Sequence, residues 1–143
     1  AMQGTDTPVW LAFTLDDADG TKLRSGEPLV EALSVAETGA AAILANCSAP
    51  EVMGAAMEVF ATGTLPFGGY ANGFTEISKG FLKDAPTVDA LSKRQDLDPD
   101  AYARFTSCWV AQGATIIGGC CEISPAHIKA VHDTLIAEGH TIV

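Results

Sequence analysis

The sequence has few basic residues and no long hydrophobic run. Lysine and arginine together number 8 against 18 aspartates and glutamates, which gives a net charge of −10. Phosphate backbones and anionic lipids repel such a chain, so nucleic acid and membrane surfaces are not expected as partners. No stretch approaches the roughly 20 apolar residues of a membrane-spanning helix, and nothing resembles a signal peptide. We therefore expect a cytoplasmic protein.

The chain is also short for the fold that its pattern indicates. Its 143 residues suffice for one domain, whereas a complete (β/α)8 barrel takes typically about 250 residues. Ala1 before Met2 is typical of an expression scar, and we expect residues 1–7 to form a tag or a disordered N-terminus. The predicted domain covers residues 8–143.

Four units of strand, loop, helix and glycine follow one another along the domain. Apolar runs predict strands at 8–15, 41–45, 66–70 and 115–117. Amphipathic segments predict helices at 25–38, from Ser48 to about 61, at 98–112 and at 125–138. This alternation predicts an α/β fold of four βα units with a parallel sheet and right-handed crossovers.

Residues 71–97 form a long connection, with brief turns expected at 81–83 and 88–91. A loop of this length within a domain usually has a functional role. Four parallel strands also leave two sheet edges and one sheet face uncovered. We therefore expect the chain to pair with a second copy of itself or with a complementary half-barrel chain.

Three of the four cysteines follow predicted strands. Cys47 comes shortly after 41–45, and Cys120 and Cys121 follow 115–117 and two glycines. The carboxyl ends of neighbouring parallel strands converge in a barrel, so these thiols are expected to meet there. Three thiolates with an open fourth position are typical of a catalytic zinc site.

Two other interpretations of the thiols remain open. Cysteines are frequently small buried packing residues, and the adjacent pair Cys120–Cys121 is also compatible with a redox role. Cys108 lies inside a predicted helix, away from any strand end, and is not expected to be a metal ligand.

Several stretches together resemble one known family. They are Phe13-Thr14-Leu15-Asp16-Asp17, Leu23-Arg24-Ser25-Gly26-Glu27-Pro28-Leu29, Asn46-Cys47, Tyr70-Ala71-Asn72 and Gly118-Gly119-Cys120-Cys121. The cysteine-containing stretches resemble the zinc signature of homocysteine S-methyltransferases, a group that includes the betaine– and S-methylmethionine–homocysteine methyltransferases. Ala71 stands where the family has proline. The resemblance covers nearly all of this chain but only about the second half of the family's TIM barrel, strands five to eight.

The resemblance implies a function for these residues. Cys47, Cys120 and Cys121 would hold Zn²⁺, with the thiol of homocysteine as the fourth ligand. A small sulfonium or quaternary ammonium donor would then give its methyl group to that thiol to form methionine, within a complete barrel. Asn46, Tyr70 and Asn72 would bind substrate or orient the ligands, although turn formation or packing explains these three equally well.

An alternative function is a non-catalytic, zinc-binding or self-assembling half-barrel. Glu122 lies beside the proposed thiolates, and its charge would weaken binding of a substrate thiolate unless it is paired. His127, His132 and His140 are expected to be surface or capping residues, and the acids Asp16, Asp17 and Asp19 to be turn residues. The stripes predicted to be buried on the four helices are Leu29, Leu33 and Ala36; Val52, Ala56, Val59 and Phe60; Tyr102, Phe105 and Trp109; and Ile128, Val131 and Leu135.

Overall fold

The computed structural model describes residues 6–75 and 91–143. The expectations for most of the N-terminus, for the turn at 81–83 and for most of the turn at 88–91 lie outside these residues. The elements in chain order are β1 (Trp10–Thr14), α1 (Leu29–Ala36), β2 (Ala42–Asn46), α2 (Pro50–Phe60), β3 (Phe67–Tyr70), α3 (Pro99–Ala111), β4 (Ile116–Ile117) and α4 (Pro125–Ala137).

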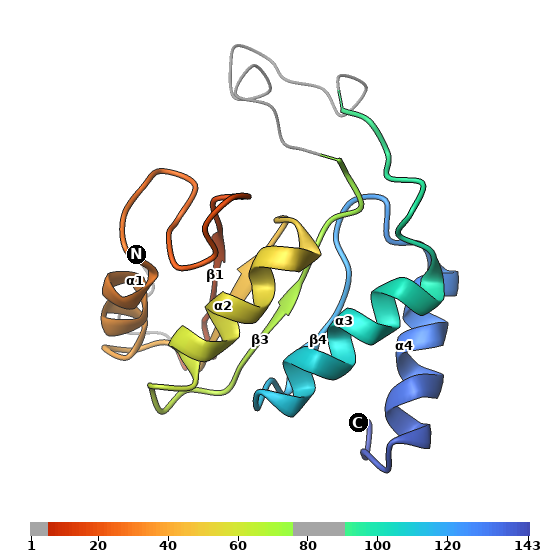
Figure 1. Ribbon diagram of the computed structural model, residues 1–143. Coiled ribbons are helices and arrows are strands. Elements are labelled where there is room, and N and C mark those ends of the chain that lie inside the picture. Colours follow the sequence, from red (N-terminus) through yellow and green to blue (C-terminus); the bar gives the residue numbers. More distant parts are fainter. Residues whose placement is uncertain (1–5, 76–90) are drawn as a thin grey trace.

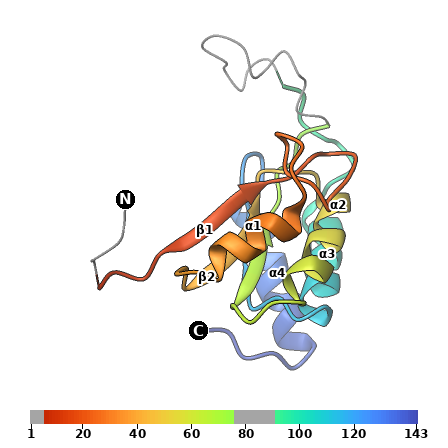
Figure 2. The same cartoon turned by 90° about the vertical axis from the view of Figure 1, so that its left-hand side faces the viewer.

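The four strands form one sheet in the order β1-β2-β3-β4, and every neighbouring pair is parallel (Figure 1). The predicted α/β class with four βα units is therefore confirmed. The helices follow the sheet along one side, and consecutive helices pack against each other (Figure 2). Because all four strands run the same way, their carboxyl ends lie at one end of the sheet, where the candidate site is built.

The core lies between the sheet and the helices. Its large side chains include Leu15, Ile43, Phe60, Tyr102 and Trp109, each at most 1% exposed. The T-shaped ring pairs Phe60–Phe67 and Tyr102–Trp109 add specific aromatic packing to this burial. The apolar layer fixes the helices on the strands and so fixes the loops that leave the strand ends.

Two predicted helix starts need correction. The first helix begins at Leu29 rather than at Ser25, because Leu23 N–H donates to the Glu27 carbonyl and closes a turn in which Gly26 has φ +108°. The expected capping box at Ser48 does not form, and Ala49 is the N-cap of α2. The Ser48 hydroxyl is fully buried and instead accepts from Leu15 N–H at 2.8 Å, so it joins β1 to the end of β2.

Some buried stripes also differ from the expectation. On α2, Met53 and Met57 are fully buried, whereas Val52 and Val59 are only partly buried. Phe105 on α3 is likewise only partly buried. Ile128 on α4 is 43% exposed, because it faces an open recess rather than a neighbouring helix. The predicted stripe of α1 and the remaining predicted positions on α2, α3 and α4 are buried as expected.

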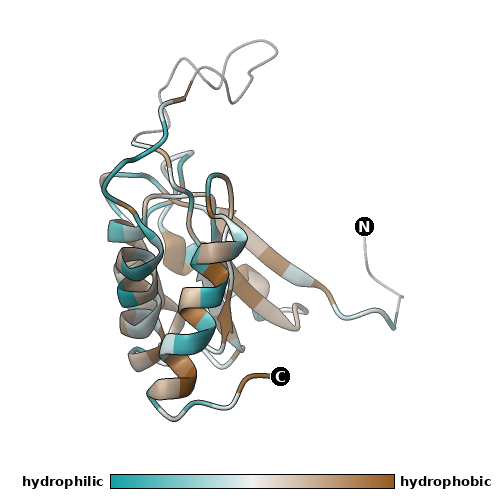
Figure 3. Cartoon of the chain, turned by 90° about the vertical axis from the view of Figure 1, so that its right-hand side faces the viewer, coloured by the Kyte–Doolittle hydropathy of each residue, from teal (hydrophilic) through white to brown (hydrophobic). Residues whose placement is uncertain are grey.

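The side of the sheet that carries no helices presents an apolar surface. Trp10 is 57% exposed there and lines a recess of about 590 Å³, which is also bordered by Ile116 of β4, by Ile128 of α4 and by the C-terminal Val143. The hydropathy colours show hydrophobic residues along β1 and at the C-terminus (Figure 3). Within residues 6–75 and 91–143, β1 and β4 have no strand on their outer sides. In the same part of the chain, no helix combines the length and apolar character needed to cross a bilayer.

Candidate metal centre

Three thiols meet at the carboxyl ends of β2 and β4. The Sγ atoms of Cys47, Cys120 and Cys121 all lie within 4.8 Å of one another, and those of the adjacent pair are 3.8 Å apart. Each of these side chains is partly exposed. Among the described residues this is the one group of three or more cysteine, histidine or acidic side chains placed to share a metal ion.

The spacing of the thiols fits the chemistry of zinc. Tetrahedral zinc with Zn–S bonds of about 2.3 Å separates its sulfur ligands by about 3.8 Å. The adjacent pair is at this separation, and an adjustment of at most about an ångström brings the third sulfur into place. Three sulfur ligands also leave the fourth tetrahedral position for a substrate atom.

Cys47 is held in a left-handed backbone conformation with φ +46°, which costs a non-glycine residue roughly 1 kcal/mol. Its N–H donates to the Tyr70 carbonyl at 3.1 Å, and its carbonyl accepts from the Arg24 guanidinium at 3.2 Å. Arg24 also pairs with Asp17 at 3.2 Å, and Asp17 accepts from Ala49 N–H at 2.9 Å. These contacts fix the turn that presents the Cys47 thiol.

The second cysteine loop is tied to the end of β3. Cys120 N–H donates to the Ala71 carbonyl at 2.9 Å, and the Cys121 carbonyl accepts from Gly73 N–H at 2.8 Å. Glu122 has φ +65°, and its carboxylate pairs with Lys93 at 3.4 Å. This pairing offsets the charge that Glu122 would otherwise place beside the thiols.

Of the three predicted substrate-binding residues, Asn72 contacts a thiol, whereas Asn46 bonds another side chain. Asn72 is 1% exposed, and its amide Nδ2 lies 3.9 Å from the Cys47 Sγ while its Oδ1 accepts from Phe74 N–H. Asn46 instead accepts from the Thr14 hydroxyl at 3.0 Å. Burial, and secondarily the nearby Cys120 and Cys47, raise the pKa of Tyr70, so its phenol stays protonated at neutral pH.

The thiols ionise as a coupled group. A hydrogen bond from Cys120 lowers the pKa of the Cys47 thiol to about 7. The same hydrogen bond raises the pKa of Cys120, and burial adds to this shift. Burial and then the charge of Cys120 raise the pKa of Cys121. Without metal, the cluster therefore favours one thiolate, on Cys47, supported by its neighbours.

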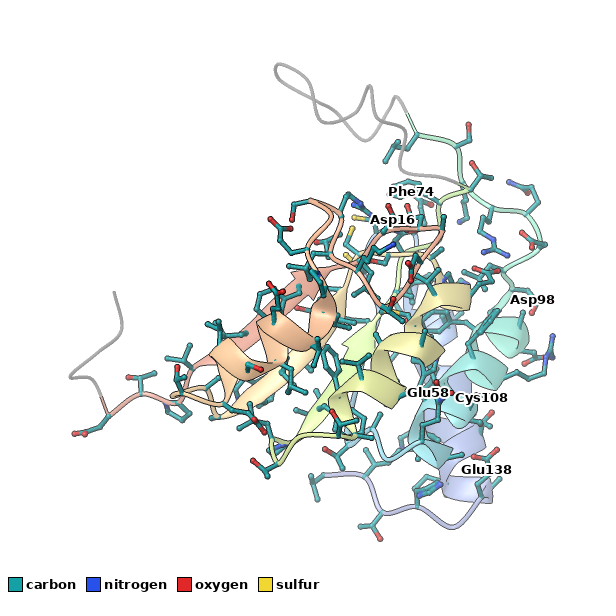
Figure 4. The ribbon with its side chains drawn as sticks, turned by 60° about the vertical axis from the view of Figure 1, so that its left-hand side comes forward. Asp16, Glu58, Phe74, Asp98, Cys108 and Glu138 are labelled. Carbon is teal, nitrogen blue, oxygen red and sulfur yellow. The ribbon has the colours of Figure 1, made fainter. Side chains whose placement is uncertain are left out.

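The remaining cysteine and the histidines lie apart from this cluster. Cys108 is exposed on α3, far from Asp16 and Phe74 at the strand ends (Figure 4). His127 caps α4 as expected, but it is buried: Nδ1 bonds Ser124, and Nε2 bonds the Leu97 carbonyl at 3.0 Å. His132 and His140 are exposed. Asp16 and Asp19 accept backbone N–H groups within their own loop, as turn residues do.

Two residues that bond the backbone around the site were not identified from the sequence. Arg24 belongs to the second of the stretches that carry the family resemblance, but nothing in the spacing shows that it reaches the Cys47 carbonyl. The helical spacing of Tyr102 predicts burial, and no sequence signal reveals the two backbone groups that its hydroxyl bonds.

The fold and the site together define a class: parallel βα units with a three-thiol, metal-type centre at the carboxyl ends of the strands. The chain belongs to the homocysteine S-methyltransferase family, whose model matches residues 1–135.

Sequence relatives agree with this assignment. Homocysteine S-methyltransferase 2 of Arabidopsis thaliana is 27% identical over 132 residues, which cover 90% of this chain and 37% of that protein. Homocysteine S-methyltransferase 4 of Zea mays is 29% identical over 131 residues, which cover 90% of this chain and 36% of the maize protein.

The fold is similar to that of a solved enzyme of the same family. The metallated form of the homocysteine methyltransferase MmuM from Escherichia coli superposes with a TM-score of 0.62 at 28% identity, over 89% of this chain and 35% of MmuM. The predicted relation to part of a TIM barrel is thereby confirmed. The chain spans a little more than a third of the length of these relatives.

Proposed function

We propose that this chain carries the zinc- and homocysteine-binding part of a homocysteine S-methyltransferase. Cys47, Cys120 and Cys121 would hold Zn²⁺, and the bound metal would accept the thiol of homocysteine. The observation that carries this proposal is the approach of three thiols from two strand ends to within 4.8 Å. Family membership supplies the reaction class.

The reaction is one displacement at carbon. The homocysteine sulfur forms a bond to the methyl carbon, the bond from that carbon to a sulfonium sulfur or quaternary nitrogen breaks, and the donor leaves with the electron pair. The thiol proton goes to solvent and the product is methionine. Bound zinc supplies the positive charge that keeps a thiol ionised at neutral pH.

The residues of this chain position the reactants. Arg24 fixes the Cys47 turn through the backbone carbonyl, and the Asn72 amide points its donors toward the Cys47 sulfur. Asn46 and Tyr70 line the adjacent strand ends and are proposed to contact substrate. Positioning of this kind accounts for much of the rate gain in a displacement that needs an in-line approach.

A second function is favoured by the exposed apolar surface around Trp10, which is 57% exposed and lines an apolar recess. In this alternative the chain is a zinc-binding or self-assembling half-barrel that transfers no methyl group. The two functions differ in whether the site accepts a homocysteine thiol and turns it over.

A cobalt(II) titration tests the proposed substrate. Cobalt(II) replaces zinc in thiolate sites and gives a sulfur-to-metal absorption that reports each added thiolate. We expect homocysteine to raise this absorption in the cobalt-loaded chain, whereas methionine, which has the same backbone and no free thiol, leaves it unchanged. Equal responses to both amino acids would contradict homocysteine as the fourth ligand.

Turnover is tested with ¹³C-methyl-labelled S-methylmethionine and betaine. The zinc-loaded chain, alone and co-expressed with the part of the maize relative that this chain does not match, is given homocysteine, and methionine is detected by NMR. Labelled methionine from either preparation supports methyl transfer. Its absence in both, with zinc and homocysteine bound, supports the non-catalytic alternative.

A further inference from the structure

One hydrogen bond of the sheet between β3 and β4 is made through a side chain. Gly118 N–H donates to the Gly69 carbonyl at 3.1 Å, and Cys120 N–H donates to the Ala71 carbonyl at 2.9 Å. In a parallel ladder, Ala71 N–H would donate to the Gly118 carbonyl between these two bonds. Instead, Ala71 N–H donates to the Tyr102 hydroxyl at 3.1 Å, and that hydroxyl donates to the Gly118 carbonyl at 2.7 Å.

The Tyr102 ring has little freedom to move. It is fully buried, and the rings of Trp109 and His127 pack edge-on against it, each with centroids 6.0 Å away. His127 is itself fixed at both ring nitrogens by Ser124 and the Leu97 carbonyl. Packing against Trp109 of α3 and His127 of α4 therefore holds the Tyr102 hydroxyl in a fixed place at the sheet.

The bridged groups adjoin the thiol cluster. Gly118 lies two residues before Cys120, and Ala71 directly precedes Asn72, whose amide contacts the Cys47 sulfur. One bridging oxygen replaces a direct N–H to carbonyl bond, so the two strands are held apart at this point. The ladder resumes at once with the Cys120 bond. The Tyr102 hydroxyl thus links two backbone segments. One leads from Gly118 to Cys120, and the other leads from Ala71 to Asn72, whose amide contacts the Cys47 sulfur.

We propose that Tyr102 is a positioning residue for the metal centre: its hydroxyl bridges β3 and β4 and sets the place of Cys120 relative to Cys47. This inference rests on the proposed metal-binding function. Among the described residues, the Tyr102 hydroxyl bonds two backbone groups, Ala71 N–H and the Gly118 carbonyl, and so acts through the backbone of the two strand ends.

The Tyr102→Phe substitution keeps the ring and removes the bridge. Ala71 N–H and the Gly118 carbonyl then either bond directly, which draws the strands together, or remain without their partner. In the first case Cys120 shifts relative to Cys47, and in the second the backbone that leads to Cys120 loses a fixed support. Supporting groups around a metal site typically change its affinity about 10- to 100-fold when they are removed, and we expect a loss in this range.

Thr106→Val is the matched control. Thr106 lies on the same helix, is fully buried, and its hydroxyl bonds only the Ala103 carbonyl within α3 among the contacts described, at 2.8 Å. Its loss removes a buried hydroxyl without touching the strand ends. The wild-type chain and both variants are compared by metal-free thermal unfolding, by cobalt(II) affinity and by the shape of the cobalt–thiolate spectrum.

The inference expects weaker binding and an altered spectrum in Tyr102→Phe alone. Wild-type affinity and spectrum in Tyr102→Phe would overturn it, even if stability falls. A wild-type chain that binds no cobalt(II) or zinc would overturn the metal site as well. If Tyr102→Phe does not fold, amide exchange in the wild type decides: zinc should slow exchange at Ala71 more than at Ile43, a ladder amide distant from the thiols, and equal slowing would overturn the inference.

Discussion

Arg94 holds residues 93–96 against α2 and against the loop after β3, beside the thiol cluster. Its guanidinium is 14% exposed and pairs with Glu51 on α2 at 2.7 Å and with Asp96 at 2.6 Å. Its backbone N–H donates to the Gly73 carbonyl at 2.8 Å, and Gly73 in turn bonds the Cys121 carbonyl. Arg94 therefore connects α2 with the backbone that borders the candidate site.

The Arg94→Gln substitution is expected to lower stability and to change its pH dependence. The hydrogen bond from Arg94 holds the pKa of Asp96 below its ordinary value of 3.8. Asp96 thus stabilises the fold above about pH 4, and this contribution is lost as the pH falls through its lowered pKa. Urea unfolding at pH 7 and at pH 3 should show a smaller pH effect in the variant than in wild type.

Lys129→Gln is the control for this prediction. Lys129 pairs with Asp133 on α4, but its side chain is 75% exposed, so solvent screens the pair. We expect little change in stability at pH 7. An Arg94→Gln chain as stable as the Lys129→Gln chain at pH 7 would show that the Arg94 contacts do not hold the segment.

At the residue scale, the sequence predicts identities better than contacts. Cys47, Cys120 and Cys121 were expected to meet, because parallel strands align their carboxyl ends. The partners of these residues depend on side chains from distant segments, such as Arg24 beside Cys47. No local pattern encodes a contact between residues 23 positions apart, so the sequence alone did not reveal it.

At the scale of elements, the pairing of β3 with β4 depends on a glycine. A Cβ on Gly68 would lie 1.7 Å from the carbonyl oxygen of Ile116, a backbone atom that cannot turn aside. The strand β4 comprises only Ile116–Ile117, so it has few other bonds to hold it in register. The absence of a side chain at this position lets the two strands approach.

Gly68→Ala should therefore destabilise the chain by about 3 kcal/mol, the upper range for overpacking a close contact. Gly39→Ala is the control, since a Cβ there meets no atom within 4 Å. The midpoint of urea unfolding should fall in the first variant and stay near wild type in the second. Equal midpoints would contradict the close approach of β3 and β4.

Element type follows from the sequence more reliably than element boundaries. Hydrophobic period and glycine positions predict all four strands and helices, including the Ser124–Pro125 start of α4. The predicted start of α2 was wrong because the buried Ser48 hydroxyl accepts from Leu15 N–H, just after β1, instead of capping the helix. Val52 and Val59, predicted to be buried, are only partly buried and pack against the edge of the core, whereas Met53 and Met57 are fully buried.

At the scale of the whole molecule, the open side of the sheet predicts association. Trp10 on the edge strand β1 is 57% exposed and adjoins an apolar recess, and an edge strand with such a surface is suited to pairing. Self-association or pairing with a complementary half-barrel remains a prediction.

Trp10→Glu tests this prediction. A buried charge at the interface should weaken association at least about tenfold, which corresponds to 1.4 kcal/mol. Val35→Glu is the control, because Val35 is 64% exposed on α1, on the helical side of the sheet. Light scattering over a range of concentrations, with and without a complementary half, gives the association constants. A wild-type chain that stays monomeric throughout would contradict the prediction.

The most direct measurement for the whole account is the zinc content of the purified chain, with Cys47→Ser and Cys108→Ser beside it. The account predicts about one zinc per wild-type chain, lost in Cys47→Ser and retained in Cys108→Ser, whose thiol is exposed on α3. No zinc in the wild type, or zinc unaffected by Cys47→Ser, would contradict the three-thiolate centre.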